Sequence, residues 1–330
     1  MRAAILREFG PIDGVTPGEF PAPVPTANEV LIDVEAAPIN YVDLIVITGR
    51  YQFLPTLPFV PGKGPAGIVR AVGANVTDLK VGDRVLAMAE QGGYAEQVAV
   101  AANQCYRLPP AMSFVEAAAM SLAYDTSWFA LRDRARVQPG ETVLVLGASG
   151  AVGLAAIQLA KAMGARVLAG IARPEKAAAV MAAGADATID LSGDNLRDTL
   201  RERVQAANSG NYADIILDPL GGDVFDAAIR ALAWRGRLVV IGFAAGHIPT
   251  LKVNYLMVKN IEVSGLQVSD YRKRRPELVA ECYAELFAFY EQGKLRPAQA
   301  TLYPLDHVRD ALRSVQDRTA TGRPVLVFGS

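Results

Sequence analysis

The sequence predicts an α/β protein in which a turn-rich β region precedes a parallel sheet that helices cover on both faces. Two observations indicate this. Residues 1–120 consist of short β-like runs broken by Gly and Pro, whereas from about residue 122 short apolar strands alternate with helical stretches. The chain has 330 residues, of which 51% are hydrophobic and 20% charged, and this is typical of a soluble protein with room for two domains.

The first region is predicted to form a small twisted barrel or sandwich. Glycine and proline recur at 10–25 and 49–67. Between and after these turns lie three β-like runs, at 29–36, 67–73 and 94–102. Short strands separated by turn residues are typical of all-β architecture.

The second region is predicted to form a doubly wound parallel sheet. Helical stretches such as 175–184 and 224–234 fall between its strands, and this alternation favours parallel strands buried on both faces. Six segments are expected to be its strands: 142–147, 166–171, 187–190, 214–218, 237–243 and 261–268.

The last 60 residues resemble the first region more than the second. They contain one long amphipathic segment, at 276–295, and end in a strand-like run at 324–329. We therefore expect one catalytic domain from residues 1–122 and 268–330, and one nucleotide-binding domain from residues 123–267. The cofactor is expected in the cleft between the two domains.

Composition excludes several classes of protein. The net charge is −1, and the one basic run, at 271–277, is interpreted as a solvated helix start, so nucleic acid is not an expected partner. The N-terminus lacks the apolar core of a signal peptide, and no apolar run is long enough to span a membrane. Two cysteines, Cys105 and Cys282, are too few for a disulfide framework, so a reduced, cytoplasmic protein is expected.

Three glycines lie between the predicted strand at 142–147 and an Ala-rich helical stretch. Gly147 can make the sharp turn, Gly150 lets the backbone approach a diphosphate, and Gly153 allows close helix–strand packing. Amides at the helix N-terminus then face the phosphates. The spacing G-x-x-G-x-x-G differs from the commoner G-x-G-x-x-G, but its place between a strand and a helix predicts a dinucleotide site.

The end of the next strand indicates which dinucleotide binds. An NAD site usually has a carboxylate there for the ribose hydroxyls, whereas this chain has Gly170, Ile171 and Ala172, followed by Arg173 and Lys176. Cations at this position suit a 2′-phosphate, which favours NADPH. The alternative is that both cations are simply the solvated start of a helix.

Further motifs run along nearly the whole chain, in the segments 39–51, 61–69, 81–85, 92–100, 147–165, 218–222, 240–249 and 295–305. With these segments the chain resembles the medium-chain dehydrogenase/reductase superfamily, and within it the zinc-free quinone oxidoreductase (zeta-crystallin-like) family. The resemblance implies a GroES-like β-barrel catalytic domain with a Rossmann-type nucleotide domain.

The resemblance also predicts that no metal is bound. Zinc-dependent relatives hold zinc through Cys, His and a further Cys or carboxylate, but Asn40 and Lys63 stand at the positions matching the Cys and His. Residues 122–124 supply no thiolate, and residues 90–110 lack a four-cysteine zinc loop. The two histidines, His247 and His307, lie far from these positions in sequence.

Without a Lewis acid, hydride delivery to an already electrophilic acceptor is easier than hydride abstraction from an alcohol. A quinone or an activated alkene spreads the incoming charge, so the protein has mainly to position the reactants. Asn40, Tyr41, Tyr51 and Lys63 are the candidate donors to the developing oxyanion. The alternatives are that Tyr41 is a core aromatic and that Lys63 is a solvated loop residue.

The resemblance implies further cofactor contacts. The chain departs from the family pattern at two positions. At the adenine end, Leu191 stands where relatives often have Tyr or His, and beside Lys63, Gly64 stands where relatives often have an acidic residue. The full set of expected cofactor residues is Asn40, Tyr51, Thr126, Ser149, Gly150, Ala151, Val152, Ala172, Arg173, Lys176, Leu191, Phe243, Ala244, Leu266, Gln267 and Arg318.

Three functions remain open at this stage. The first is NADPH-dependent reduction of a quinone, and the second is reduction of an α,β-unsaturated carbonyl. The third is NADPH binding in a structural or nucleic-acid-binding role without turnover. The resemblance also implies a homodimer that pairs the edge strand at 261–268, and a small-molecule quinone or activated alkene as the substrate.

Overall fold

The computed structural model describes residues 1–193 and 195–329, and its chain divides into two compact units. The first unit contains the described residues of Met1–Leu122, Arg272–Tyr283 and Pro297–Ser330. The second contains Ala123–Tyr271 and Ala284–Arg296. The predicted domain boundaries stay a proposal, and they differ from these units at residues 268–271 and 284–296, which belong to the second unit and not to the first.

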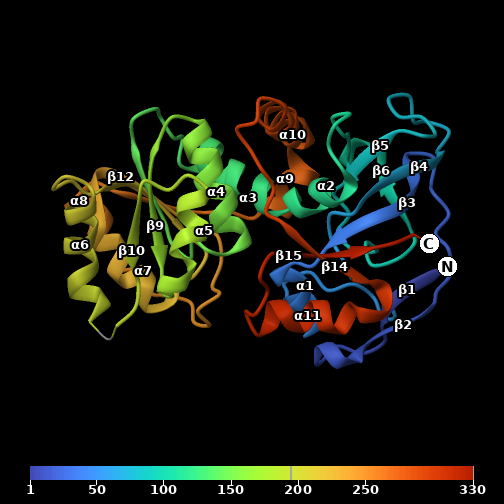
Figure 1. Ribbon diagram of the computed structural model, residues 1–330, viewed down its shortest axis with the longest axis horizontal. Coiled ribbons are helices and arrows are strands. Elements are labelled where there is room, and N and C mark those ends of the chain that lie inside the picture. The colour runs from blue at the N-terminus through green and yellow to red at the C-terminus, as the bar shows by residue number, and fades with distance from the viewer. Residues whose placement is uncertain (194, 330) are drawn as a thin grey trace. The chain divides into compact units, whose positions relative to one another are not determined.

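The first unit is built on a sheet of seven strands (Figure 1). Its order is β14-β15-β3-β4-β5-β7, and β6 also pairs with β3. A separate antiparallel pair consists of β1 (Arg2–Leu6) and β2 (Val15–Glu19). The strands of the main sheet are β3 (Glu29–Pro38), β4 (Ala66–Val72), β5 (Arg84–Ala87), β6 (Gln97–Ala101), β7 (Cys105–Arg107), β14 (Ala300–Pro304) and β15 (Arg323–Val327).

Strand β3 forms the centre of this sheet because its sequence alternates. Val30, Ile32 and Val34 are buried, and the residues between them are half-buried. The strand is antiparallel to β4, β6 and β15, so the last strand of the chain lies beside the third. Helices of this unit are α1 (Tyr41–Ile47), α2 (Phe114–Met120) and α11 (Val308–Gln316).

The second unit is a six-stranded parallel sheet with the order β10-β9-β8-β11-β12-β13. The order reverses between β8 and β11, which defines a doubly wound Rossmann-type sheet and confirms the predicted fold class. The strands are β8 (Thr142–Val145), β9 (Arg166–Ile171), β10 (Ala187–Asp190), β11 (Ala213–Asp218), β12 (Leu232–Val240) and β13 (Glu262–Gly265).

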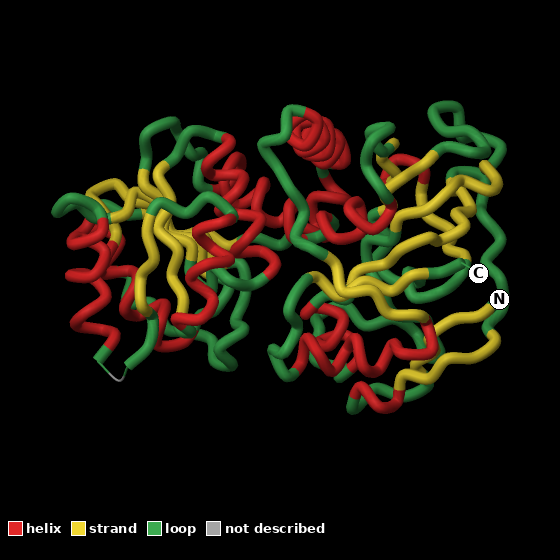
Figure 2. The backbone as a smooth tube through the Cα atoms, viewed as in Figure 1, coloured by secondary structure: helices red, strands yellow, loops and turns green. Residues whose placement is uncertain are grey.

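Helices lie on both sides of this sheet, as Figures 1 and 2 show. The segments β9 and β10 run between α4 and α5 on one side and α6 and α7 on the other. The helices are α3 (Ala123–Trp128), α4 (Ala151–Ala162), α5 (Ala177–Ala182), α6 (Leu196–Ala207), α7 (Gly222–Ala228) and α8 (Asn254–Lys259). Two further helices each contain residues of both units, α9 (Val268–Arg274) and α10 (Pro276–Glu291).

Several predicted segments end earlier than the sequence pattern indicated, and two of them show why. The strand expected at 261–268 stops at Gly265, and Val268 begins α9. The Gln267 side chain explains this boundary, because its Oε1 accepts a hydrogen bond from the Ser269 amide (3.1 Å) and so caps the helix start. The helical stretch expected at 224–234 gives way to β12 at Leu232, whose buried side chain is in register with Ala213 of β11.

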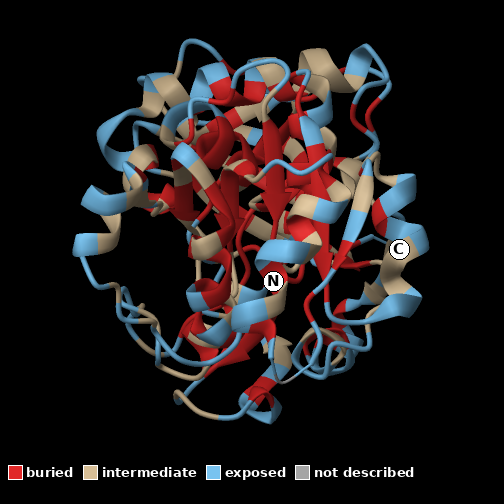
Figure 3. Ribbon diagram, turned by 90° about the vertical axis from the view of Figure 1, so that its left-hand side faces the viewer, coloured by how far each residue is buried: buried red, intermediate tan, exposed pale blue. Residues whose placement is uncertain are grey.

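Each unit has its own hydrophobic core. Figure 3 shows the buried strands at the centre and the exposed outer faces of the helices. One core cluster contains Ile5, Ile32 and Ile47 of the first unit, and another contains Leu144, Leu168 and Ile216 of the second. Among the described residues, no helix combines the length and the apolar composition that crossing a membrane requires.

Candidate functional site

The glycine loop between β8 and α4 has the geometry of a diphosphate cradle. Gly147 adopts φ +60°, and a Cβ there would lie 2.9 Å from Leu220 Cδ2. At Gly153 a Cβ would lie 2.5 Å from the carbonyl oxygen of Ala148, so a side chain would push α4 away from the loop. A Cβ at Gly150 would instead meet only the Gly147 carbonyl oxygen, at 3.4 Å. Two glycines therefore shape the loop, and the third leaves space above it.

The N-terminus of α4 is suited to an anion. Gly150 is its N-cap and has no side chain to cap the first turn. The Leu154 amide makes the first helical hydrogen bond, to the Gly150 carbonyl (2.9 Å), so the preceding amides of the turn are not used within the helix. Amides and helix dipole together favour a phosphate there. The predicted cofactor residues Ser149, Ala151 and Val152 belong to this turn, and the segment fits a dinucleotide diphosphate.

The end of β9 lies beside the glycine loop, because the Ala148 amide donates to the Gly170 carbonyl (2.9 Å). Arg173 and Ala172 follow the strand and are exposed, and Lys176 is half-buried. Leu191 is buried, and its amide donates to the Ile171 carbonyl (2.8 Å). The structure thus brings these predicted residues to one edge of the sheet, with cations where an NAD site usually has an acid.

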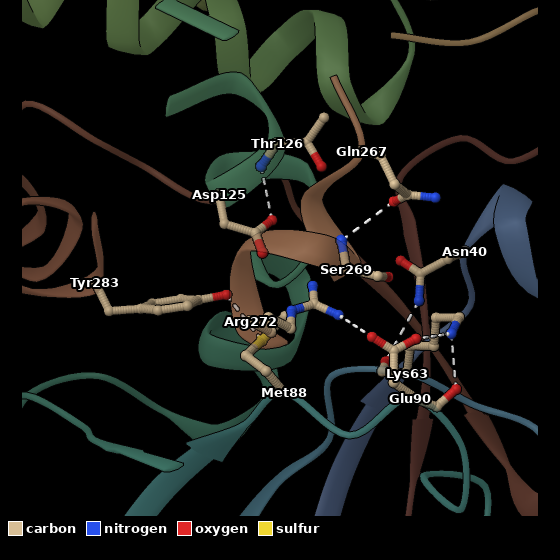
Figure 4. Close-up of polar contacts among 10 residues, drawn as sticks. All are labelled: Asn40, Lys63, Met88, Glu90, Asp125, Thr126, Gln267, Ser269, Arg272 and Tyr283. Carbon is tan, nitrogen blue, oxygen red and sulfur yellow. Dashed lines mark hydrogen bonds and ion pairs between the residues drawn. The ribbon is translucent and has the colours of Figure 1, made fainter. Parts of the chain in front are cut away.

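The remaining predicted contacts of the second unit lie at the same edge or in its helices. The loop after β12 carries Phe243, which is 41% exposed, and Ala244, whose amide donates to the Pro219 carbonyl (3.1 Å). Leu266 extends the pairing of β13, because its amide donates to the Val240 carbonyl (3.0 Å). In α3, the Thr126 amide donates to Asp125 Oδ1 (2.7 Å; Figure 4).

Asp218, at the end of β11, is a residue to which the sequence assigned no role. Its Oδ1 accepts hydrogen bonds from the amides of Leu220 and Gly221, both at 2.9 Å. Its carbonyl accepts from Ile241 (2.8 Å), so this turn connects β11 to the loop that carries Phe243. The run 218–222 was a motif of the resemblance, and that was the signal that pointed to it.

The Asp218 carboxyl is fully buried, and its Oδ2 has no hydrogen-bond partner among the described residues. Burial raises the pKa of Asp218 from its ordinary value of 3.8, although the two backbone amides oppose the shift. The strand order reverses between β8 and β11, and the buried Asp218 stabilises the turn after β11. The glycine loop follows β8, on the other side of this reversal.

In the first unit, Asn40 is the N-cap of α1, and its buried side chain makes hydrogen bonds with three other segments of the chain. Its amide group donates to Asp43 Oδ2 (3.1 Å) and to the Lys63 carbonyl (3.3 Å), and its Oδ1 accepts a hydrogen bond from Arg323. Burial raises the pKa of Asp43, whereas hydrogen bonds from Tyr94 and Asn40 and the charge of Lys63 lower it. Asn40 thus holds α1, β15 and the Lys63 backbone together.

Lys63 is buried and ion-paired (Figure 4). Its Nζ donates to the carbonyl oxygen (2.7 Å) and to Oε2 (2.6 Å) of Glu90, and it lies 5.6 Å from the centroid of the Tyr51 ring. Glu90 Oε1 accepts from Arg272 Nη1 (3.0 Å). Glu90 was missed because no sequence pattern relates it to Lys63. Lys63 is therefore not the solvated loop residue of the alternative interpretation. The alternative for Tyr41 is wrong as well, because this side chain is 49% exposed and is not a core aromatic.

Gly64 explains why the acidic partner of Lys63 comes from elsewhere in the chain. It adopts φ +70°, and a Cβ there would lie 2.4 Å from Ser121 Oγ. No side chain fits that space without a shift of Ser121, whose hydroxyl donates to the Gly64 carbonyl (3.0 Å). The basic run at 271–277 also differs from its interpretation as a solvated helix start, because Arg272 is buried and Lys273 lies 4.7 Å from the Phe53 ring centroid.

Of the remaining predicted residues, Arg318 belongs to the first unit, whereas Arg173 and Lys176 belong to the second. Their joint contact with a 2′-phosphate stays a prediction. Within the described residues, no group of three or more His, Cys, Asp or Glu side chains is arranged to hold a metal ion.

Comparison with known proteins places this architecture in a family. Residues 26–110 match the family model described as alcohol dehydrogenase GroES-like domain, and residues 151–285 match the one described as zinc-binding dehydrogenase. The chain is 37% identical over 329 residues to quinone oxidoreductase-like protein 2 homolog of Nematostella vectensis, covering 98% of this chain and 88% of the relative.

Solved structures agree with this assignment. Escherichia coli quinone oxidoreductase complexed with NADPH superimposes with a TM-score of 0.90 at 28% identity, covering 99% of this chain and 100% of that one. The CurK enoyl reductase superimposes with a TM-score of 0.89 at 26% identity, covering 99% of each chain. The protein is a medium-chain dehydrogenase/reductase and an oxidoreductase. Within that superfamily, the chain belongs to the quinone oxidoreductase family.

The cations after β9 generate a prediction about the cofactor. Replacing Arg173 and Lys176 together with Ala is expected to weaken NADPH binding by roughly 5- to 150-fold and to leave NADH binding nearly unchanged, because only NADPH carries the 2′-phosphate. Fluorescence titration of both cofactors measures this. Arg166→Ala, at the opposite end of β9, is the matched control. Equal losses for NADPH and NADH in the double variant contradict the assignment.

Proposed function

We propose that this protein is an NADPH-dependent, zinc-independent quinone oxidoreductase. The observation that carries the proposal is the buried Lys63 ammonium, 5.6 Å from the Tyr51 ring centroid, at a position where zinc-dependent relatives have a metal ligand. An ammonium held by a carboxylate has no free lone pair for zinc, but it can donate a hydrogen bond to a developing oxyanion.

NADPH is the cofactor that the second unit fits best. The turn at 147–153 holds the diphosphate, and Arg173 and Lys176 provide charge for the 2′-phosphate. NADPH bound there supplies a hydride equivalent. Phe243 and Ala244 are proposed to contact the nicotinamide half, since their loop is hydrogen-bonded to the 218–222 turn.

On the acceptor side, Lys63 and Tyr51 are the proposed donors to the acceptor oxygen, with Tyr41 as a further exposed phenol. Asn40 is proposed to act indirectly, because its amide donates to the Lys63 carbonyl while its oxygen accepts from Arg323. A quinone stabilises most of the incoming charge itself, so the donors contribute orientation and part of the charge stabilisation.

The second candidate is reduction of an α,β-unsaturated carbonyl. The similarity to the CurK enoyl reductase favours it, and the same donors suit an enolate oxygen. Because an enone is the weaker electrophile, its reduction depends more strongly on a well-placed donor than quinone reduction does. The two functions therefore predict different sensitivities to the same substitution.

A short acceptor panel tests the proposed function. The purified protein, incubated with NADPH, is expected to oxidise the cofactor in the presence of a neutral naphthoquinone, and more slowly with a simple enone. Loss of NADPH absorbance measures both rates. Dialysis against a chelator is expected to leave the rates unchanged, with elemental analysis as the accompanying measurement. Absence of NADPH oxidation with every acceptor, or activity that leaves with one zinc per chain, overturns the proposal.

Substitution of Tyr51 separates the two acceptor classes. Tyr51→Phe keeps the ring and removes only the hydroxyl. Quinone reduction is expected to fall by about tenfold or less, and enone reduction by more, towards the roughly 10²–10³-fold that loss of an essential donor costs. The measurement is kcat on both acceptors. A collapse of quinone reduction by three orders of magnitude indicates obligatory acid catalysis and contradicts this mechanism.

We also propose a homodimer. Strand β13 ends the sheet order, and its outer edge pairs with no other strand of the described chain. Large apolar side chains of β12, of the following loop and of α8, which precede β13 in the chain, are exposed by 70–74%: Trp234, Ile248, Val253, Met257 and Val258. Light scattering is expected to give twice the chain mass, and Met257→Lys with Val258→Lys is expected to give monomer. A wild-type monomer at micromolar concentration rules the dimer out.

A further inference from the structure

We propose that Glu90 is a positioning residue that holds the Lys63 ammonium beside the Tyr51 ring, and that Arg272 in turn fixes the Glu90 carboxylate. The inference rests on the proposed function, in which Lys63 donates to the acceptor oxygen. It adds two residues, Glu90 and Arg272, to which neither the sequence pattern nor the family resemblance assigned a role.

The first observation is that both hydrogen bonds of Lys63 Nζ go to one residue. Nζ donates to the Glu90 carbonyl oxygen (2.7 Å) and to Glu90 Oε2 (2.6 Å; Figure 4). A lysine side chain has four rotatable carbon–carbon bonds, so an unrestrained ammonium samples many positions. Two acceptors on one residue, one of them charged, restrict it to a single position.

The second observation is that the carboxylate is itself held. Glu90 Oε1 accepts from Arg272 Nη1 (3.0 Å), so the two oxygens of Glu90 contact two different cations. The Lys63 and Arg272 side chains are 5% and 3% exposed, whereas that of Glu90 is 38% exposed. The bridge therefore connects the 61–64 turn to the end of α9 through buried cations.

The third observation is that the backbone at Lys63 is fixed independently. Asn40 Nδ2 donates to the Lys63 carbonyl (3.3 Å), and Asn40 is itself held by Arg323 and Asp43. With its main chain anchored by Asn40 and its ammonium by Glu90, Lys63 has both ends restrained. No hydrogen bond to the third Nζ hydrogen is found among the described residues, and in the proposed mechanism it is this hydrogen that Lys63 donates to the acceptor oxygen.

The charges around Lys63 define what this arrangement favours. The cluster Lys63–Glu90–Arg272 carries two positive charges and one negative charge. The Asp43 carboxyl of α1 also interacts electrostatically with Lys63, and Arg323 of β15 donates a hydrogen bond to Asn40 Oδ1. Two buried cations that share one partly exposed carboxylate leave an excess positive charge, which favours an arriving negative charge such as that on the oxygen of a reduced acceptor.

An ion pair with a purely structural role has the same contacts, so the test must separate the two roles. A double-mutant cycle does this, because a residue that acts through Lys63 loses its effect once Lys63 is changed. The variants are Glu90→Gln, Lys63→Met and the double variant. The acceptor is the member of the quinone and enone panel that is most sensitive to Tyr51→Phe.

The positioning role predicts a specific pattern in the cycle. Glu90→Gln is expected to lower kcat by roughly tenfold in the wild-type background, a fraction of what complete loss of a donor costs, and by less than about twofold in Lys63→Met. The NADPH dissociation constant, measured by fluorescence titration, is expected to change by less than about twofold in all variants. Equal effects of Glu90→Gln in both backgrounds overturn the proposal, and so does Lys63→Met with wild-type kcat.

Two further variants guard against loss of folding. Glu90→Asp keeps the charge on a side chain shorter by one methylene, and it is expected to keep the melting temperature near wild type while lowering kcat. If Glu90→Gln does not fold, the cycle is run with Glu90→Asp under the same criteria. Glu277→Gln, an exposed carboxylate paired with Arg275, is the control and is expected to leave kcat unchanged.

Failure of this inference is distinguishable from failure of the proposed function. A wild-type protein that reduces quinones with NADPH, combined with additive effects in the cycle, leaves the function standing and makes Glu90 structural. If none of the acceptors in the panel supports NADPH oxidation by the wild-type protein, the proposed function is wrong, and so is this inference.

Discussion

The close approach of α4 to the loop after β8 is the constraint on which the nucleotide half of this protein depends. At Gly153 the helix lies so near the loop that a Cβ would be 2.5 Å from the Ala148 carbonyl oxygen. That approach brings the first turn of α4 to the carboxyl edge of the sheet. The end of β9 and the 218–222 turn reach the same edge through hydrogen bonds and through the contact of Leu220 with Gly147. The absence of a side chain at Gly153 and at Gly147 thus allows three segments to meet.

Burial of charge has a comparable role in the first unit. Lys63, Asp43 and Arg272 are buried away from water. A hydrogen-bond or ion-pair partner of each one offsets the free-energy cost of this desolvation. The Lys63 and Arg272 side chains are buried, but their shared partner Glu90 is 38% exposed, so solvent screens these pairs and losing one costs less than losing a fully buried pair. The same restraint that satisfies the charges also gives the ammonium a fixed position.

The choice between a quinone and an enone depends on how much stabilisation the acceptor needs. Hydride transfer leaves negative charge on the acceptor, and a quinone distributes that charge over its own ring. The protein then contributes mainly orientation, and no single side chain need dominate the rate. An enone requires more help, which in the proposed mechanism comes from the Lys63 ammonium and the Tyr51 phenol.

The sequence by itself determined the strand and helix alternation of the second region, three strands of the first region (β3, β4 and β6), the glycine turn at 147–153 and the cations after β9, whereas helices α1 and α2 of the first region were not predicted. The predicted features depend on local periodicity and on the backbone requirements of single residues. The partner of Lys63 was decided only by the tertiary structure, since Glu90 lies 27 residues away and Arg272 lies 182 residues from Glu90. The burial of Asp218 and the exposure of Tyr41 were decided in the same way. Strand register and packing bring distant residues together, and no local pattern in the chain encodes which of them will meet.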